Sequence, residues 1–313
     1  MRRSNNATRS FWPIIAVTIL LILVVLAYLL TTHWLRGTPP GKGITIPISH
    51  TPILTITTLP RPDHIVIVME ENRAYSDIIG SSDAPYINAL AQQGAVFTRS
   101  YAVTHPSEPN YLALFSGSTQ GATSDACPLT FSGPNLGHSL LNAHLSFAGY
   151  SESMPTNGYT GCYAPNSLTA EYARKHSPWV NFTNIPASSN LTFNSFPTDY
   201  NKLPAVSFVI PNLYDDMHSA SVQQGDTWLK GHMSGYAQWA RTHNSLLIIT
   251  WDEDDGSASN QIPTLFIGSM VKPGRYSEQI SHYSVLRTIE DMYGLPTLNE
   301  SAYVGAISDV WQK

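Results

Sequence analysis

Four short apolar runs mark the chain after residue 60. Each run is continuous and rich in aliphatic side chains, and it does not alternate strictly between apolar and polar positions. Runs of this kind indicate strands that are buried on both faces, as the strands of a parallel sheet are. The four predicted strands are His64–Met69, Ala205–Ile210, Ser245–Thr250 and Pro263–Gly268.

Helical periodicity fills much of the chain between these runs. Apolar residues recur there three or four positions apart, which is the spacing of one helix face. Gly94, Gly149 and Gly294 stand where helices are expected to stop. The alternation predicts an α/β fold with a mostly parallel central sheet and helices on both faces. The predicted helices cover residues 85–93, 111–115, 136–148, 222–242 and 283–293.

The N-terminal region has a different pattern, because residues 11–31 contain no charged side chain. At about 1.5 Å per residue, this run is long enough to cross a hydrocarbon core of about 30 Å as a helix. A cleaved signal peptide is the alternative, but its apolar core is normally only about 7–15 residues long and ends near small residues. We therefore expect an uncleaved transmembrane anchor.

The basic residues around this run predict its orientation. Arg2, Arg3 and Arg9 precede it, whereas only Arg36 and Lys42 follow closely. The positive-inside rule then places the N-terminus in the cytoplasm and the rest of the chain outside it, at the cell membrane. The predicted parts are a cytoplasmic tail (1–10), a transmembrane anchor (11–31), a tether (32–60) and a catalytic domain (61–313).

The composition argues against nucleic-acid binding and favours a disulfide. The chain has a net charge of −5 and only 12% charged residues, and no Lys/Arg cluster follows the anchor. Nucleic acid is therefore not an expected partner. Cys127 and Cys162 are the only cysteines, and both lie in the part predicted to be outside the cytoplasm. We expect them to form a disulfide, with two buried free thiols as the alternative.

Acidic and polar residues follow three of the four predicted strands. They are residues 70–72, 211–218 and 251–255. Ligands of open α/β sheets bind beyond the carboxyl ends of the strands, so these residues are expected to meet. Alone, each cluster is also explained as a helix cap or a solvated turn.

Three such clusters in one crevice would repel one another unless a cation lay between them. Carboxylate, amide and imidazole groups suit Ca²⁺, Mg²⁺, Mn²⁺ or Zn²⁺, and the identity and number of the ions stay open.

Ser107 is the candidate nucleophile. It lies in the segment THPSEPN (104–110), just before a predicted helix. Backbone N–H groups and the positive dipole at a helix N-terminus bind phosphate and favour an alkoxide. A serine at this position is also an ordinary N-cap. Its hydroxyl is a poor nucleophile at neutral pH, so a metal ion or a base must activate it.

Six segments together resemble the phosphoesterase family of the alkaline phosphatase superfamily, which contains microbial acid phosphatases and bacterial phospholipases C. The resemblance covers residues 64–296 and rests on the order and spacing of the segments. It implies an alkaline phosphatase-like fold. The segments span residues 64–80, 104–121, 172–179, 211–219, 250–256 and 281–296.

The resemblance also implies roles for individual residues. Ser107 matches the family nucleophile, whose hydroxyl also faces the metal. His105 lies two residues away and is not expected to act as the base. His218 and His282 are implied to be catalytic as well, and Asn72, Lys175 and His176 to contact the substrate phosphate. The implied metal ligands are Glu71, Asn72, Ser107, Asp216, His218, Asp252, Glu253 and His282, with Glu70 less clearly matched.

In two-metal relatives, the residues corresponding to Asp216, His218 and His282 hold a second ion. In some acid phosphatases they contact phosphate directly, so the resemblance leaves the metal number open.

These observations predict a metal-dependent phosphoric ester hydrolase that acts through a phosphoserine. An acid-phosphatase-like phosphomonoesterase is favoured, because the bacterial phospholipases C carry more sequence beyond the catalytic core. A phospholipase C-like phosphodiesterase is the alternative within the enzyme class, and a non-catalytic, metal-stabilised binding domain is the alternative outside it. The expected substrate is a phosphorylated small molecule or a lipid headgroup.

Overall fold

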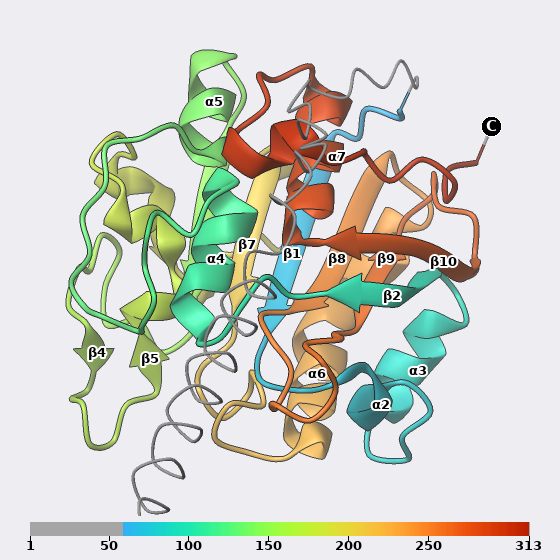
Figure 1. The fold of residues 1–313 in the computed structure, drawn as a ribbon, viewed down its shortest axis with the longest axis horizontal. Helices are drawn as coiled ribbons and strands as arrows, with labels where there is room; N and C mark the ends of the chain where they lie inside the picture. The colour runs from blue at the N-terminus through green and yellow to red at the C-terminus, as the bar shows by residue number, and fades with distance from the viewer. Residues whose placement is uncertain (1–58, 313) are drawn as a thin grey trace, which may run out of the picture. The chain divides into compact units, whose positions relative to one another are not determined.

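The computed structural model describes residues 59–312, which form an α/β domain around one large sheet (Figure 1). The sheet has eight strands in the order β10-β2-β9-β8-β1-β7-β3-β6. The strands are β1 (His64–Glu70), β2 (Ala95–Tyr101), β3 (Phe147–Ser151), β6 (Asn190–Thr192), β7 (Val206–Ile210), β8 (Ser245–Trp251), β9 (Thr264–Ile267) and β10 (Gly274–Ser281). A separate two-stranded sheet pairs β4 (Tyr163–Ala164) with β5 (Tyr172–Ala173).

The sheet is mostly parallel, as the sequence predicts. Strands β8, β1, β7, β3 and β6 run parallel, each to its neighbour. Strand β9 is antiparallel to both of its neighbours, β8 and β2, and β2 pairs in parallel with β10. All four predicted strands are present, with β1 at the centre and β7 and β8 on either side of it. The carboxyl ends of β1, β7 and β8 therefore meet at one edge of the sheet, whereas that of the antiparallel β9 lies at the opposite edge.

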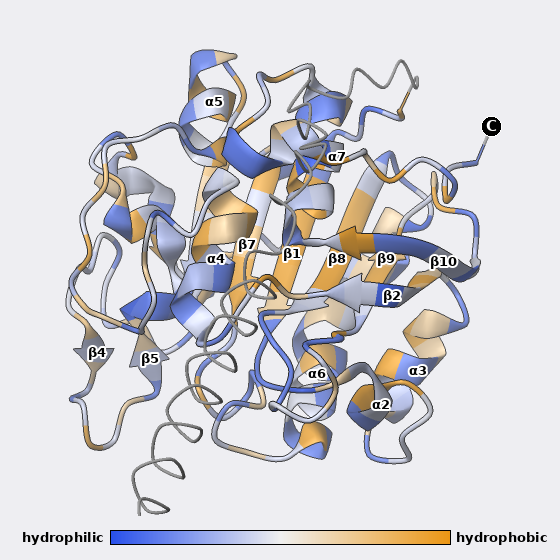
Figure 2. Ribbon diagram, in the orientation of Figure 1, coloured by the Kyte–Doolittle hydropathy of each residue, from blue (hydrophilic) through white to orange (hydrophobic). Residues whose placement is uncertain are grey.

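Helices cover both faces of the sheet. Ile65 and Ile67 of β1 belong to a core with α4, α5 and α7, whereas Val66 and Val68 belong to a core with α3 and α6. Figure 2 shows the apolar strands β1, β7 and β8 at the centre, between these layers. The helices are α2 (Tyr75–Ile78), α3 (Pro85–Ala91), α4 (Ser107–Ser116), α5 (Leu136–Asn142), α6 (Val222–Ala240) and α7 (His282–Tyr293).

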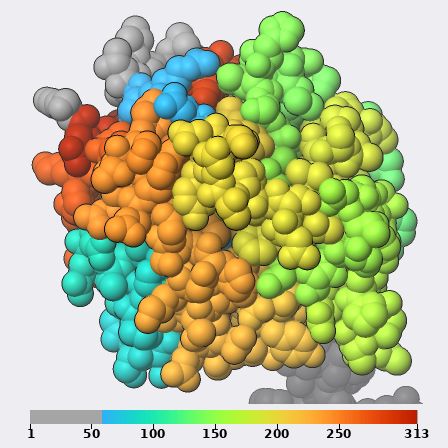
Figure 3. Space-filling model, turned by 180° about the vertical axis from the view of Figure 1, so that it is seen from behind, coloured from blue at the N-terminus to red at the C-terminus, as the bar shows by residue number. Residues whose placement is uncertain are grey.

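The far side of the sheet is seen in Figure 3, where residues of α6 (orange) lie beside those of α2 and α3 (cyan). Apolar side chains of α6 such as Leu229 and Met233 point inward and are fully buried. Ser221 is the N-cap of this helix, and its side chain accepts a hydrogen bond from the backbone N–H of Gln224. Its length matches the long amphipathic pattern in the sequence.

One predicted helix is wrong in its second half. The segment 136–148 is helical only to Asn142, and Phe147–Ser151 forms strand β3. Gly149 is therefore not a helix stop but lies inside a fully buried strand. A Cβ at this position would come within 2.1 Å of the ring of Trp179, so glycine is needed for close packing. Gly294 does end a helix, in the left-handed conformation with φ 66°.

Strands β2, β6 and β10 are not among the strands predicted from the sequence. In β10, intermediate and exposed positions alternate along most of the strand, which lies at the edge of the sheet. Its sequence, GRYSEQIS, has no apolar run because only a small part of it is buried. A continuous apolar run is typical of a central strand and is absent from such an edge strand.

The predicted tail, anchor and almost all of the tether lie outside the described residues. Within residues 59–312, no helix has both the length and the apolar character needed to cross a bilayer. The predicted disulfide is confirmed, because Cys127 and Cys162 are bonded.

Candidate active site

The carboxyl ends of β1, β7 and β8 bring three acidic residues together. Glu71 follows β1, Asp216 lies in the loop after β7, and Asp252 follows β8. The backbone N–H of Glu71 donates to the carbonyl of Asp216 at 2.8 Å, and that of Asp252 donates to the carbonyl of Glu70 at 3.0 Å. These bonds extend the sheet pairing past the strands, so the three fully buried carboxyl groups stay close.

Two left-handed residues turn the chain at this edge. Asn72 has φ 50°, a conformation that asparagine tolerates. Met217 has φ 75°, which is uncommon for a residue with a side chain. The side chain of Met217 is fully buried against Gly225 of α6, where a Cβ would come within 2.6 Å of it. Gly225 thus leaves room for the turn that positions Asp216.

Glu71, Asp216 and His176 form a cluster suited to a metal ion. One donor atom from each lies within 4.8 Å of the others, and all three side chains are buried. His176 Nε2 lies 2.9 Å from Glu71 Oε1, and Nδ1 lies 3.3 Å from Asp216 Oδ2. Apart from these ion-pair contacts, His176 Nε2 and Asp216 Oδ2 make no hydrogen bond in the described part of the chain. A cation that took the place of the ring proton would therefore have imidazole and carboxylate atoms as ligands.

Helix α4 brings two side chains to this cluster. Ser107, its first residue, has Oγ at 3.1 Å from Glu71 Oε2 and at 3.3 Å from Glu253 Oε1. Tyr111 lies one turn later and donates from its hydroxyl to Glu71 Oε1 at 2.7 Å. Its ring also stacks on His176, with centroids 4.9 Å apart. The i, i+4 spacing therefore places both residues over Glu71.

A second group of polar atoms lies around Asp252. Its Oδ1 accepts from the backbone N–H of Asn72 at 3.0 Å. His282, the first residue of α7, has Nε2 at 2.8 Å from the carbonyl oxygen of Asp252. A carbonyl only accepts, so Nε2 carries the proton and Nδ1 has the lone pair. Nδ1 of His282 and Oδ2 of Asp252 are both buried without a hydrogen-bond partner among the described residues.

The electrostatics of the site favour a cation. Burial raises the pKa of Asp216 to about 7, and burial with the charges of Glu71 and Glu253 raises that of Asp252 well above its ordinary value. Burial would also raise the pKa of Glu71, but the positive charge of His176 lowers it instead. Burial opposes the charged form of His176, yet Glu71 and Asp216 raise its pKa to about 9. A divalent cation would relieve the remaining repulsion between the carboxylates.

The other predicted residues also lie near this edge. The ring of His218 is 5.9 Å from that of His176, and its Nδ1 contacts Ser219. Glu253 Oε2 lies 2.5 Å from Nδ1 of the half-exposed His105. Lys175 forms an ion pair with Asp125 at 2.8 Å.

The family resemblance implies that His176 contacts phosphate, and the structure places it in the cluster with Glu71 and Asp216. It comes from η1 (Arg174–His176), a short 3₁₀ helix after β5, and its side chain is buried. Neither Tyr111 nor Asp125 is among the site residues predicted from the sequence. The i+4 spacing from Ser107 is a signal for Tyr111, whereas nothing near Asp125 in the sequence indicates its contact with Lys175.

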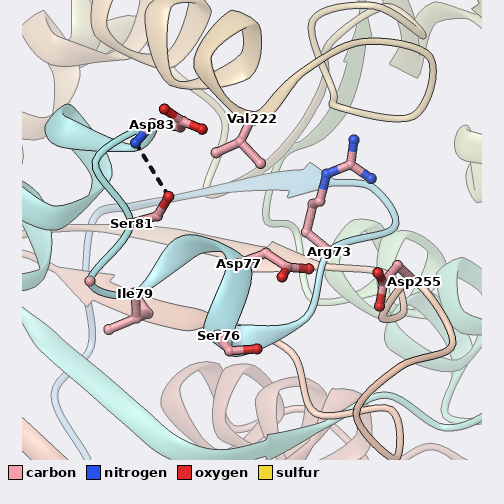
Figure 4. A pocket seen from close by; sticks show the side chains of 9 residues that line it. Arg73, Ser76, Asp77, Ile79, Ser81, Asp83, Val222 and Asp255 are labelled. Carbon is pink, nitrogen blue, oxygen red and sulfur yellow. Dashed lines mark hydrogen bonds between the residues drawn. The ribbon is translucent and has the colours of Figure 1, made fainter.

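A separate cavity of about 640 Å³ opens beside this edge. Arg73 and Asp255 line it, and they follow Asn72 and Glu253 closely in the chain. Figure 4 shows these two side chains across from those of α2. The guanidinium of Arg73 donates to the carbonyl groups of Asn72 and Ala220. The cavity thus lies next to the candidate site and does not include Ser107.

The sequence profile of the Phosphoesterase family matches residues 81–296. The chain belongs to the Phosphoesterase family. It is 49% identical over 295 residues to a phosphatidylinositol-3-phosphatase of Mycobacterium tuberculosis, which covers 93% of each chain. It is 31% identical over 244 residues to an acid phosphatase of Aspergillus fumigatus, covering 73% of this chain and 54% of that one. This chain is a hydrolase of phosphoric esters.

Solved structures support the fold. A member of the alkaline phosphatase superfamily from Vibrio parahaemolyticus superposes with a TM-score of 0.56 at 15% identity, covering 82% of this chain and 75% of that one. The alkaline phosphatase-like α/β fold expected from the sequence is therefore present. The match to acid phosphatases spans little more than half of their length.

Proposed function

We propose that the enzyme hydrolyses phosphate monoesters through a covalent phosphoserine on Ser107. The observation that carries the proposal is the position of its hydroxyl. Ser107 Oγ lies at the first residue of α4 and within 3.3 Å of carboxylate oxygens from both Glu71 and Glu253. A nucleophile needs a neighbouring group that takes its proton, and a phosphoryl group is stabilised at a helix N-terminus.

The cluster of Glu71, His176 and Asp216 fits a divalent cation, since its donor atoms are close, buried and partly without hydrogen bonds. Asp252 and His282 offer a further pair of such atoms. A cation bound there would lower the pKa of the Ser107 hydroxyl and neutralise charge on the phosphoryl oxygens. The mixed carboxylate and imidazole donors accommodate Mn²⁺ or Zn²⁺ as well as Mg²⁺ or Ca²⁺.

The residues of the chain then carry the proton transfers. Burial raises the pKa of Glu253 to about 7, so its carboxylate accepts the proton of Ser107 near neutral pH. Oγ attacks phosphorus, the bond to the ester oxygen breaks, and Glu253 returns the proton to the departing alcohol. Burial lowers the pKa of His218, which leaves its ring neutral and able to take a proton from water. That water cleaves the phosphoserine, and the proton returns to Ser107 as inorganic phosphate leaves.

For the substrate, we propose a phosphorylated lipid headgroup. The relative named phosphatidylinositol-3-phosphatase is similar over nearly the whole of both chains, which supports this class. We further propose that residues 11–31 anchor the enzyme in the cell membrane with the domain outside the cytoplasm. An anchor of this kind would hold the site close to lipid headgroups.

The test uses the full-length chain in mild detergent. Ser107→Ala is expected to lower kcat on p-nitrophenyl phosphate by about 10³-fold or more, because the attacking oxygen is lost. Trapping with a labelled phosphate ester should give phosphoserine in the wild type and none in the variant. Activity of the variant close to wild type would refute the proposal. A phosphocholine diester assayed in parallel distinguishes monoesterase from phosphodiesterase activity.

A further inference from the structure

The N-terminus of α4 already carries a negatively charged group from the chain itself. The backbone N–H of Glu108 donates to Asp125 Oδ1 at 2.9 Å. The ammonium of Lys175 donates to the other oxygen, Oδ2, at 2.8 Å. Both oxygens of one carboxylate are therefore bound, each by a donor that also suits a phosphate oxygen.

Both donors adjoin the candidate catalytic residues. Glu108 follows Ser107 in the first turn of α4, and the N-cap of this helix, Pro106, offers no side-chain hydrogen bond. Lys175 directly precedes His176, and only 11% of its side chain is exposed. Its ion pair with Asp125 thus places a positive charge one residue from His176 and beside the first turn of α4.

A phosphoryl group on Ser107 would meet carboxylates. The hydroxyl of Ser107 is hydrogen-bonded to Glu71 and Glu253, whose charges repel phosphate oxygens. The Glu108 N–H and the Lys175 ammonium are groups that attract such oxygens. In the structure, both groups are engaged by Asp125.

We propose that Asp125 is an internal competitor of the phosphoryl group. Its carboxylate binds the two donors when no substrate is present, gives them up when a phosphate ester binds, and takes them back as inorganic phosphate leaves. Asp125 thereby weakens the binding of substrate and product. This role rests on the proposed function, because it assumes that the phosphoryl group is transferred to Ser107.

The location of Asp125 suits such an exchange. It lies in the loop between α4 and α5, and 30% of its side chain is exposed. Once displaced, its carboxylate has access to water, so its charge stays hydrated. The disulfide at Cys127, two residues later, keeps the loop beside the site.

The test is the inhibition of p-nitrophenyl phosphate hydrolysis by inorganic phosphate. Asp125→Asn keeps the size of the side chain and removes its charge. We expect the inhibition constant for phosphate and the KM each to fall by about fivefold or more, because the competing charge is lost. Asp125→Ala should shift both constants in the same direction, which covers the case in which the amide disturbs folding.

Asp199→Asn is the matched control. Asp199 also pairs with a lysine, Lys202, at 3.5 Å, but this pair is exposed and comes from other elements. The control should leave both constants within twofold of the wild type. If Asp125 only holds Lys175 in place, its variants will show an unchanged or higher inhibition constant, and the inference is overturned. Ser107→Ala tests the proposed function separately, because its loss of activity does not depend on the result for Asp125.

Discussion

Glu71 and Glu290 are both fully buried glutamates, yet their surroundings differ in kind. Glu71 meets His176, Ser107 and Tyr111, and other carboxylates lie close by. Glu290 lies in α7 and accepts hydrogen bonds from the Ser301 hydroxyl, at 2.7 Å to one oxygen, and from the backbone N–H of Leu298.

Burial raises the pKa of Glu290 to about 8, whereas the charge of His176 keeps Glu71 ionised. The comparison shows that burial alone does not mark a functional carboxylate. Glu290 is paired with neutral donors that join α7 to η6 (Asn299–Tyr303), so it serves the fold. Glu71 remains charged among other charged groups, which is costly unless the arrangement serves binding or catalysis.

The largest difference in activity between the two regions is expected when each glutamate is replaced by glutamine. Glu71→Gln should lower kcat/KM on p-nitrophenyl phosphate by about 10³-fold, because a ligand charge and a partner of Ser107 are lost. Glu290→Gln should stay within about twofold, since an amide still accepts and donates hydrogen bonds there.

Calorimetric titration with Mg²⁺, Mn²⁺, Ca²⁺ and Zn²⁺ checks the same pair of variants. After treatment with a chelator, Glu290→Gln should bind the activating ion as the wild type does, and Glu71→Gln should bind it much more weakly. Equal binding by both variants would remove the distinction between the two glutamates.

A smaller effect is expected from Gly225→Ala in α6. The added methyl group would press on Met217 and the carbonyl of Asp215, and so displace the turn that carries Asp216. We expect kcat/KM to fall about 10- to 100-fold, as small displacements of catalytic groups do. Gly231→Ala in the same helix meets no atom within 4 Å. That variant should keep its activity and gain about 0.5–1 kcal/mol of stability, measured by urea unfolding.

The titration of Glu290 should have the smallest effect on activity, because it acts on the free energy of unfolding. Its pKa of about 8 in the folded chain exceeds the ordinary 4.5, so the folded state keeps a proton that the unfolded state has lost between these values. Raising the pH through this window therefore lowers the free energy of unfolding, by up to about 5 kcal/mol in total. Urea unfolding at several pH values between about pH 5 and pH 9 should show a smaller decrease in the free energy of unfolding for Glu290→Gln than for the wild type. Identical pH profiles for the variant and the wild type would contradict the assignment.

The sequence predicts the convergence of Glu71, Asp216 and Asp252, because the carboxyl ends of parallel strands share one edge. The strand pattern alone does not distinguish Glu70 from Glu71, although the family resemblance favours Glu71, because the choice of face depends on how β1 packs between α4 and α6. Val66 and Val68 face α6, so Glu70 follows them to that side. The position of His176 was also beyond prediction, because it depends on a short 3₁₀ helix in a long segment of irregular structure.

The Cys127–Cys162 disulfide links the two segments that supply Asp125 and Lys175. Cys127 lies two residues after Asp125, and the carbonyl of Cys162 accepts a hydrogen bond from Arg174, next to Lys175. The bond closes a loop over a sequence separation of 35 residues. By chain-entropy arguments, such a closure costs the unfolded ensemble about 4 kcal/mol of conformational freedom. The disulfide therefore stabilises this part of the site by lowering the conformational entropy of the unfolded chain, in addition to the contacts made in the folded state.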